Sequence, residues 1–153
     1  MMSSRLNDRL PEPLLDLLSR GCAALVLTVG ADGFPNTAYS WAIARDNTSI
    51  RFCADDGSET LANLYREQCA SLQIIGPGNI IYLIKGSASQ TKPQIEATPF
   101  RIAMLTLHVK EAKDQSWPGV SVRPLIYDWE PEQRREMLAM EQNVYSEMRH
   151  WVG

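Results

Sequence analysis

The residues best placed to hold a ligand follow the third extended run of the sequence, Ser49 to Cys53. The loop Asp55-Asp56-Gly57 leads into Ser58, and Leu61, Leu64 and Tyr65 then form an apolar stripe at helical spacing. This pattern predicts a helix that begins after Ser58 and leaves backbone N–H groups free to attract an anion. The alternative is that Ser58 only caps a structural helix.

A second candidate surface lies on the run from Pro35 to Arg45, which is typical of a β-strand. Successive side chains of a strand alternate between two faces, so this run has one face of larger and one of smaller side chains. The larger face is predicted to be core or interface and contains Thr37, Tyr39, Trp41 and Ile43. The smaller face leaves room for a flat ligand and contains Asn36, Ala38, Ser40, Ala42 and Ala44.

The cysteine and histidine residues indicate neither disulfides nor a metal site. Cys22, Cys53 and Cys69 have no paired spacing and are expected to be free thiols. His108 and His150 have no ligand partners at metal-binding spacing. His108 is either a proton donor near a ligand or, more simply, a strand residue bonded to backbone or water. No Ser, His and carboxylate combination converges, so catalytic residues stay unassigned.

Composition indicates one domain, residues 1–153. The net charge of −3 provides no general basic field for nucleic acid. The sequence has no apolar run long enough to span a membrane, and its start lacks the apolar segment of a signal peptide. We therefore expect a cytoplasmic protein that binds neither nucleic acid nor membrane.

The apolar patterns predict a mainly β (α+β) fold, a barrel of antiparallel strands with flanking helices. Asp32-Gly33 favours a tight hairpin, and Gly86-Ser87 suggests a bulge that curls the sheet. A terminal helix over about 130–151 has an apolar stripe that packs within the chain or across a dimer. The strands are expected at residues 25–29, 35–45, 49–53, 70–75, 80–89 and 103–111, after a first helix at 12–21.

One pattern in this chain is similar to a known family. A Thr-x-x-x-Asp-Gly-x-Pro hairpin, Thr28 to Pro35, is followed one strand later by Ser58 and a helix that contains Asn63-Leu64. With the order of elements over about residues 10–112, this pattern resembles the pyridoxamine 5′-phosphate oxidase-like FMN-binding split barrels. The resemblance implies a six-stranded antiparallel split β-barrel and an FMN-dependent oxidoreductase that acts on a small-molecule substrate.

The resemblance also implies where FMN binds. In that family two subunits form a homodimer, and the cofactor cleft lies at the subunit interface. Carried over to this sequence, the residues lining the flavin ring are Ser40, Trp41 and Ala42, those along the ribityl chain are Cys53 and Ala54, and those around the phosphate are Ser58, Glu59, Thr60 and Asn63.

The sequence departs from the family at the phosphate position. Many relatives have Arg or Lys where this chain has Glu59-Thr60, and a carboxylate there repels a phosphate. Arg51, Arg66 or Arg123 of a second subunit could compensate. The alternatives are a split-barrel dimer that has lost FMN and acts as a ligand-binding or regulatory module, or one that binds another flat ligand such as a deazaflavin or heme, with His108 as the candidate heme ligand.

Overall fold

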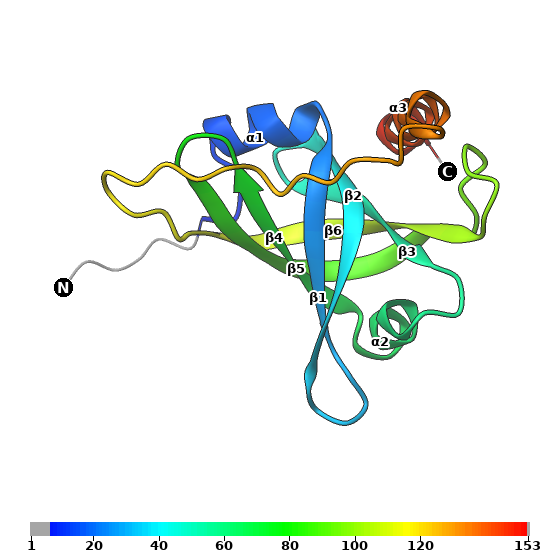
Figure 1. Ribbon diagram of the computed structural model, residues 1–153. Helices are drawn as coiled ribbons and strands as arrows, with labels where there is room; N and C mark the ends of the chain where they lie inside the picture. The colour runs from blue at the N-terminus through cyan, green and yellow to red at the C-terminus, as the bar shows by residue number, and fades with distance from the viewer. Residues whose placement is uncertain (1–6, 153) are drawn as a thin grey trace.

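Six antiparallel strands form a closed barrel with three helices around it (Figure 1). The computed structural model describes residues 7–152. The strands follow one another around the barrel in the order β1-β2-β3-β6-β5-β4, which confirms the predicted fold class. The elements are α1 (Glu12–Ser19), β1 (Cys22–Val29), β2 (Pro35–Asp46), β3 (Ser49–Asp55), α2 (Glu59–Glu67), β4 (Cys69–Gly76), β5 (Ile80–Lys92), β6 (Ile102–Asp114) and α3 (Arg134–His150).

The barrel interior is filled by alternate side chains of the strands. Val26, Phe52, Leu72 and Leu107 are fully buried there, as the period of two in a strand requires. Helices α1 and α2 lie at opposite ends of the barrel in Figure 1, and each contributes leucines to this core. None of the helices within residues 7–152 has the length and apolarity needed to span a bilayer.

The predicted bulge at Gly86 is confirmed. The register between β5 and β6 shifts between Lys85 and Gly86. A Cβ atom at Gly86 would lie 2.1 Å from the carbonyl oxygen of His108, so only glycine allows the two backbones to approach this closely. The bulge therefore lets these long strands bend enough for the sheet to close.

Helix α3 packs its apolar stripe against the outside of the barrel. Met140, Val144 and Met148 form a second core with Trp41 and Ile43 of β2. The methionine-rich stripe is thus internal packing, one of the two possibilities predicted from the sequence. The helix begins at Arg134 rather than near 130, because residues 131–133 form a turn closed by the bond from the N–H of Gln133 to the carbonyl of Glu130.

A segment with little regular structure, residues 115–133, joins β6 to α3. We call it the crossing segment, since it runs from the β4–β5 turn across the molecule to α3 (Figure 1). The N–H groups of Val122 and Leu125 donate to the carbonyls of Gly78 and Ile75, which tie its first half to that turn. Its second half reaches β2 and α3.

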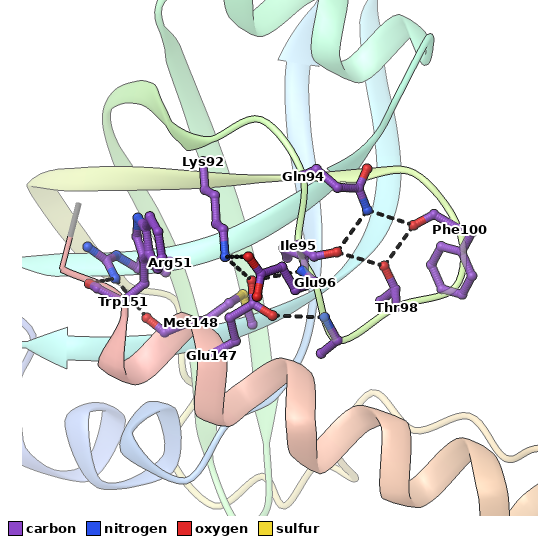
Figure 2. A network of polar contacts seen from close by, with 11 residues as sticks. Arg51, Lys92, Gln94, Ile95, Glu96, Thr98, Phe100, Glu147, Met148 and Trp151 are labelled. Atoms are coloured by element: carbon purple, nitrogen blue, oxygen red, sulfur yellow. Dashed lines mark hydrogen bonds and ion pairs between the residues drawn. The ribbon is translucent and has the colours of Figure 1, made fainter.

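Polar contacts hold the last turns of α3 (Figure 2). The carboxylate of Glu147 accepts a hydrogen bond of 2.8 Å from Lys92 Nζ and further bonds from the N–H groups of Glu96 and Ala97. The buried Arg51 guanidinium donates to the backbone carbonyls of Met148 and Trp151. These contacts fix the helix to β3 and to the loop at residues 93–101.

The Glu147 contacts predict an acid-sensitive stability. Burial on its own would raise the pKa of Glu147, but the bonds from Lys92 and the two amides outweigh it and lower that pKa below the usual value. The carboxylate therefore contributes stability above its unfolded pKa of about 4.3, and this contribution is lost as the pH falls through the lower folded pKa. We expect Glu147→Gln to reduce the free energy of unfolding at pH 7 by about 2–4 kcal/mol, since the buried Lys92 then keeps only the exposed Glu96 as a carboxylate partner.

Urea unfolding between pH 3 and pH 7 measures the stability lost in Glu147→Gln and the pH dependence of the unfolding free energy. The variant should show a flatter dependence of the unfolding free energy on pH than the wild type. Glu136→Gln, an exposed position on the same helix, is the control and should leave stability unchanged. Equal pH dependence in the wild type and Glu147→Gln would contradict the assignment.

Candidate ligand-binding cavity

The site begins where two neighbouring strands of the barrel separate. β2 and β3 pair only from Asp46↔Ser49 to Ala42↔Phe52. Beyond this point β2 continues along β1 to Pro35, and β3 continues along β6 to Asp55. The two strands follow different partners, so a split opens between residues 35–41 and residues 53–55.

The hydroxyl of Ser40 bridges the start of this split. Its Oγ accepts a hydrogen bond of 2.9 Å from the N–H of Cys53, and the carbonyls of Cys53 and Trp41 lie at 2.9 and 3.0 Å as acceptors for its proton. The side chain therefore replaces the missing backbone ladder at the last point where the strands are close.

A cavity of about 550 Å³ occupies the split. Its volume is within the range of ordinary small-molecule sites, and its lining is mainly apolar with a few polar groups. The lining residues come from five segments and are Ala38, Tyr39, Ser40 and Trp41 of β2, Cys53, Ala54 and Asp55 of β3, Ser58 and Thr60 at the start of α2, Phe100, Arg101 and Ile102 at the start of β6, and Tyr127 and Trp129 of the crossing segment.

The structure brings six of the nine predicted binding residues to this cavity. They are Ser40, Trp41, Cys53, Ala54, Ser58 and Thr60. Ala42 does not reach the cavity, since it is fully buried in the barrel core. Glu59 is exposed and lies outside the lining, and Asn63 is buried in hydrogen bonds with Thr28 and Arg66.

The small-residue face of β2 is not the slot that the sequence suggested. Only Ala38 and Ser40 of that face line the cavity, whereas Ala42 and Ala44 point into the barrel core. Tyr39 and Trp41 of the opposite face also reach the cavity. The split between strands, rather than one strand face, provides the space.

The first turn of α2 presents free amides at the cavity. Ser58 caps the helix by accepting from the N–H of Leu61, as predicted. The N–H groups of Glu59 and Thr60 make no hydrogen bond to the rest of the described chain. The Oγ1 of Thr60 accepts from the side-chain amide of Asn36, which fixes this wall of the cavity.

Arg101 is the cation at this end of the cavity, and it is not among the binding residues predicted from the sequence. It precedes β6, whose residue Ile102 pairs with Asp55 of β3, and this pairing brings the guanidinium beside the start of α2. Its side chain is 84% exposed, and Nε lies 3.4 Å from a carboxylate oxygen of Asp56. The side chain is therefore free enough to turn toward a ligand.

The compensating arginines predicted from the sequence lie elsewhere. Arg51 is bonded to carbonyls at the end of α3, and Arg66 donates to the carbonyl of Val29 and to Asn63. Neither lines the cavity. The proposed role of Arg123 concerned a second subunit and stays a prediction.

Tyr127 and Trp129 of the crossing segment form an aromatic wall of the cavity, opposite the strands. Trp41 Nε1 donates to the phenol oxygen of Tyr127 at 2.5 Å, and that phenol donates to Glu141 Oε1 at 2.6 Å. Trp129 Nε1 donates to the same oxygen at 2.7 Å. Burial, followed by the bond to Glu141, raises the pKa of Tyr127, so the phenol stays protonated and keeps donating at neutral pH.

Cys53, which lines the cavity, is not activated for nucleophilic catalysis. Burial raises the pKa of the Cys53 thiol, so it does not form a reactive thiolate at neutral pH. His108 is exposed and outside the cavity. Residues 7–152 hold no group of three His, Cys, Asp or Glu side chains arranged for a metal ion.

Solved structures share this architecture. An F420 reductase matches with a TM-score of 0.60 at 17% identity, over 69% of this chain and 100% of its own. A protein from Lactobacillus delbrueckii, provisionally assigned as a pyridoxamine 5′-phosphate oxidase, matches with a TM-score of 0.58 at 17% identity, over 70% and 95% of the two chains. The Group A Streptococcus protein HupZ matches with a TM-score of 0.58 at 16% identity, over 74% and 98%.

These likenesses show the fold. No protein-family model and no curated protein sequence matches this chain. The three structures cover 69%, 70% and 74% of this chain and nearly all of their own. The chain therefore has the split-barrel fold of the pyridoxamine 5′-phosphate oxidase-like proteins.

Proposed function

We propose that this protein is an FMN-binding oxidoreductase whose cofactor occupies the cavity at the barrel split. The observation that carries the proposal is the meeting, in one cavity, of a mainly apolar lining with free amides and a cation at one end. A flavin has the matching layout, an apolar ring system joined through a ribityl chain to a phosphate. The F420 reductase and the provisional oxidase with the same fold add support of the same kind.

The residues at each end fit this cofactor. Ser40 and Trp41 would lie along the ring, and Cys53 and Ala54 along the ribityl chain. The N–H groups of Glu59 and Thr60, together with Arg101, would hold the phosphate, because a helix N-terminus and a guanidinium both attract an anion. Asn63 and Ala42 would act indirectly, by supporting α2 and the barrel core.

The chain's own contribution to the reaction would be to bind and orient. Bound FMN would supply hydride or electron transfer. The aromatic wall would exclude water from one side of the ring, and Ser40 would keep the split at a fixed width. A small-molecule substrate would reach the ring through the exposed side of the cavity.

The charges around α2 favour a second candidate, a barrel that has lost FMN and acts as a ligand-binding or regulatory module. Asp55 lines the end of the cavity where a phosphate would bind, and two further carboxylates, Asp56 and Glu59, are close to it in sequence, outside the lining. They oppose an anion unless Arg101 and the free amides outweigh them. A deazaflavin, the cofactor class of the F420 reductase with this fold, is the other flat ligand to test.

We also propose that the protein is a homodimer with the cavity at the subunit interface. Tyr39 and Phe100 line the cavity and are 61% and 42% exposed, and Ile126, next in sequence to the lining residue Tyr127, is 77% exposed. Exposed large apolar side chains at a site are typical of interaction surfaces. A second copy would cover these side chains and form a further wall of the cavity.

Titration of FMN into the purified protein tests the main proposal. We expect quenching of flavin fluorescence and saturation at about one FMN per chain, with a micromolar or lower dissociation constant. If the protein bound a deazaflavin but no FMN, the deazaflavin alternative would replace the proposal. If it bound neither, the alternative of a barrel that has lost FMN would replace it.

The phosphate contact gives a sharper prediction. Arg101→Gln should weaken FMN by about tenfold, because one charge-assisted contact is lost. Riboflavin has no phosphate, so its affinity should not change. Arg20→Gln, an exposed position away from the cavity, is the control. Equal losses for FMN and riboflavin would mean that Arg101 does not act on the phosphate.

Light scattering on a sizing column checks the dimer. The expected mass is twice the 17.2 kDa of one chain. Ile126→Glu should shift the protein toward the single-chain mass, because it places a charge in the apolar interface, whereas Glu136→Gln should not. A single-chain mass for the wild type would contradict the proposal.

A further inference from the structure

The aromatic wall depends on one buried carboxylate that lies outside the cavity. Glu141 on α3 is 8% exposed, and its Oε1 accepts hydrogen bonds from both Tyr127 and Trp129. Within residues 7–152 no Lys, Arg or His nitrogen forms an ion pair with it. The carboxylate is therefore stabilised by two aromatic donors, and both of these side chains line the cavity.

The part of the crossing segment that carries the wall, residues 127–129, is attached through its side chains. Its backbone bonds to the rest of the barrel are made earlier, at Val122 and Leu125. Ile126 is 77% exposed, so its side chain adds little apolar burial. The aromatic rings stand edge to face, with centroids of Tyr127 and Trp129 5.8 Å apart. Tyr127 also meets Tyr39 edge to face, and Trp129 packs against the core under α3. The two bonds to Glu141 orient the polar groups of both rings.

Tyr127 links this arrangement to the barrel. Its hydroxyl has one proton, which it donates to Glu141, and its oxygen accepts from Trp41 on β2. Glu141 thus fixes the direction of the phenol O–H, and the phenol oxygen then holds the Trp41 indole. Both walls of the cavity, the one on β2 and the one on the crossing segment, are connected through this chain of bonds.

We infer that Glu141 is a positioning residue that sets the aromatic wall and, through it, the affinity of the cavity for its ring ligand. The ligand part of this inference rests on the proposed function, with FMN as the probe. The positioning part concerns the protein alone and is measured without ligand.

Two substitutions at Glu141 separate position from charge. Glu141→Leu removes the acceptor for both aromatic donors, whereas Glu141→Gln keeps an acceptor oxygen and loses only the charge. We expect Glu141→Leu to weaken FMN and riboflavin alike by at least about tenfold. Glu141→Gln should recover most of this loss. Glu136→Leu, the same substitution at an exposed position of α3, should bind like the wild type.

The ligand-free readout is the set of indole N–H resonances. In Glu141→Leu the signals of Trp41 and Trp129, assigned through their Phe variants, should shift and exchange faster with solvent, while those of Trp117 and Trp151 should not. If wild-type protein bound no FMN but these signals moved as expected, the proposed function would fail and the positioning role would stand. Unchanged Trp41 and Trp129 signals would overturn the inference.

A double-mutant cycle tests whether Glu141 and Tyr127 act on the ligand through one chain of bonds. Tyr127→Phe removes the link from the other side and leaves α3 unaltered, so it also tests the inference should Glu141→Leu not fold. The affinity losses of Glu141→Leu and Tyr127→Phe should be strongly non-additive, because both break one chain of bonds. Fully additive losses, or no loss in Tyr127→Phe, would overturn the inference.

Discussion

The separation of β2 from β3 is the constraint on which the site depends. Each strand is committed to a different neighbour, β2 to β1 and β3 to β6, and the barrel cannot close along both ladders without leaving a gap. Ser40 satisfies the backbone of Cys53 at the edge of this gap, so opening it leaves no buried donor without a partner there. The fold thus holds a cavity between two strands that are each paired with another neighbour.

The cavity is a meeting point of segments distant in sequence. The strands contribute its floor, the start of α2 its polar end, and the crossing segment its aromatic wall. Helix α3 supports that wall through Glu141. Through Glu147 it also supports the loop that leads to Phe100 and Arg101. One helix that lies outside the cavity therefore supports two of its sides.

Sequence patterns predicted the fold well because its signals are local. Alternation in the strands, Asp32-Gly33 and the Ser58 cap each act over a few residues. The misplacement of Ala42 has a different cause, since whether a strand face points into the barrel or into the split is decided by pairing with distant strands. Arg101 and Tyr127 reach the cavity only through such pairing and packing, so no spacing in the sequence indicates their position.

Trp41 belongs to two environments at once. Its ring is part of the apolar core under α3, and its indole N–H points to Tyr127 at the cavity. Any molecule that binds against this residue also favours the docked state of the terminal helix, by the linkage that joins ligand binding to folding. A ligand in the cavity should then slow amide hydrogen exchange in α3, a helix outside the cavity.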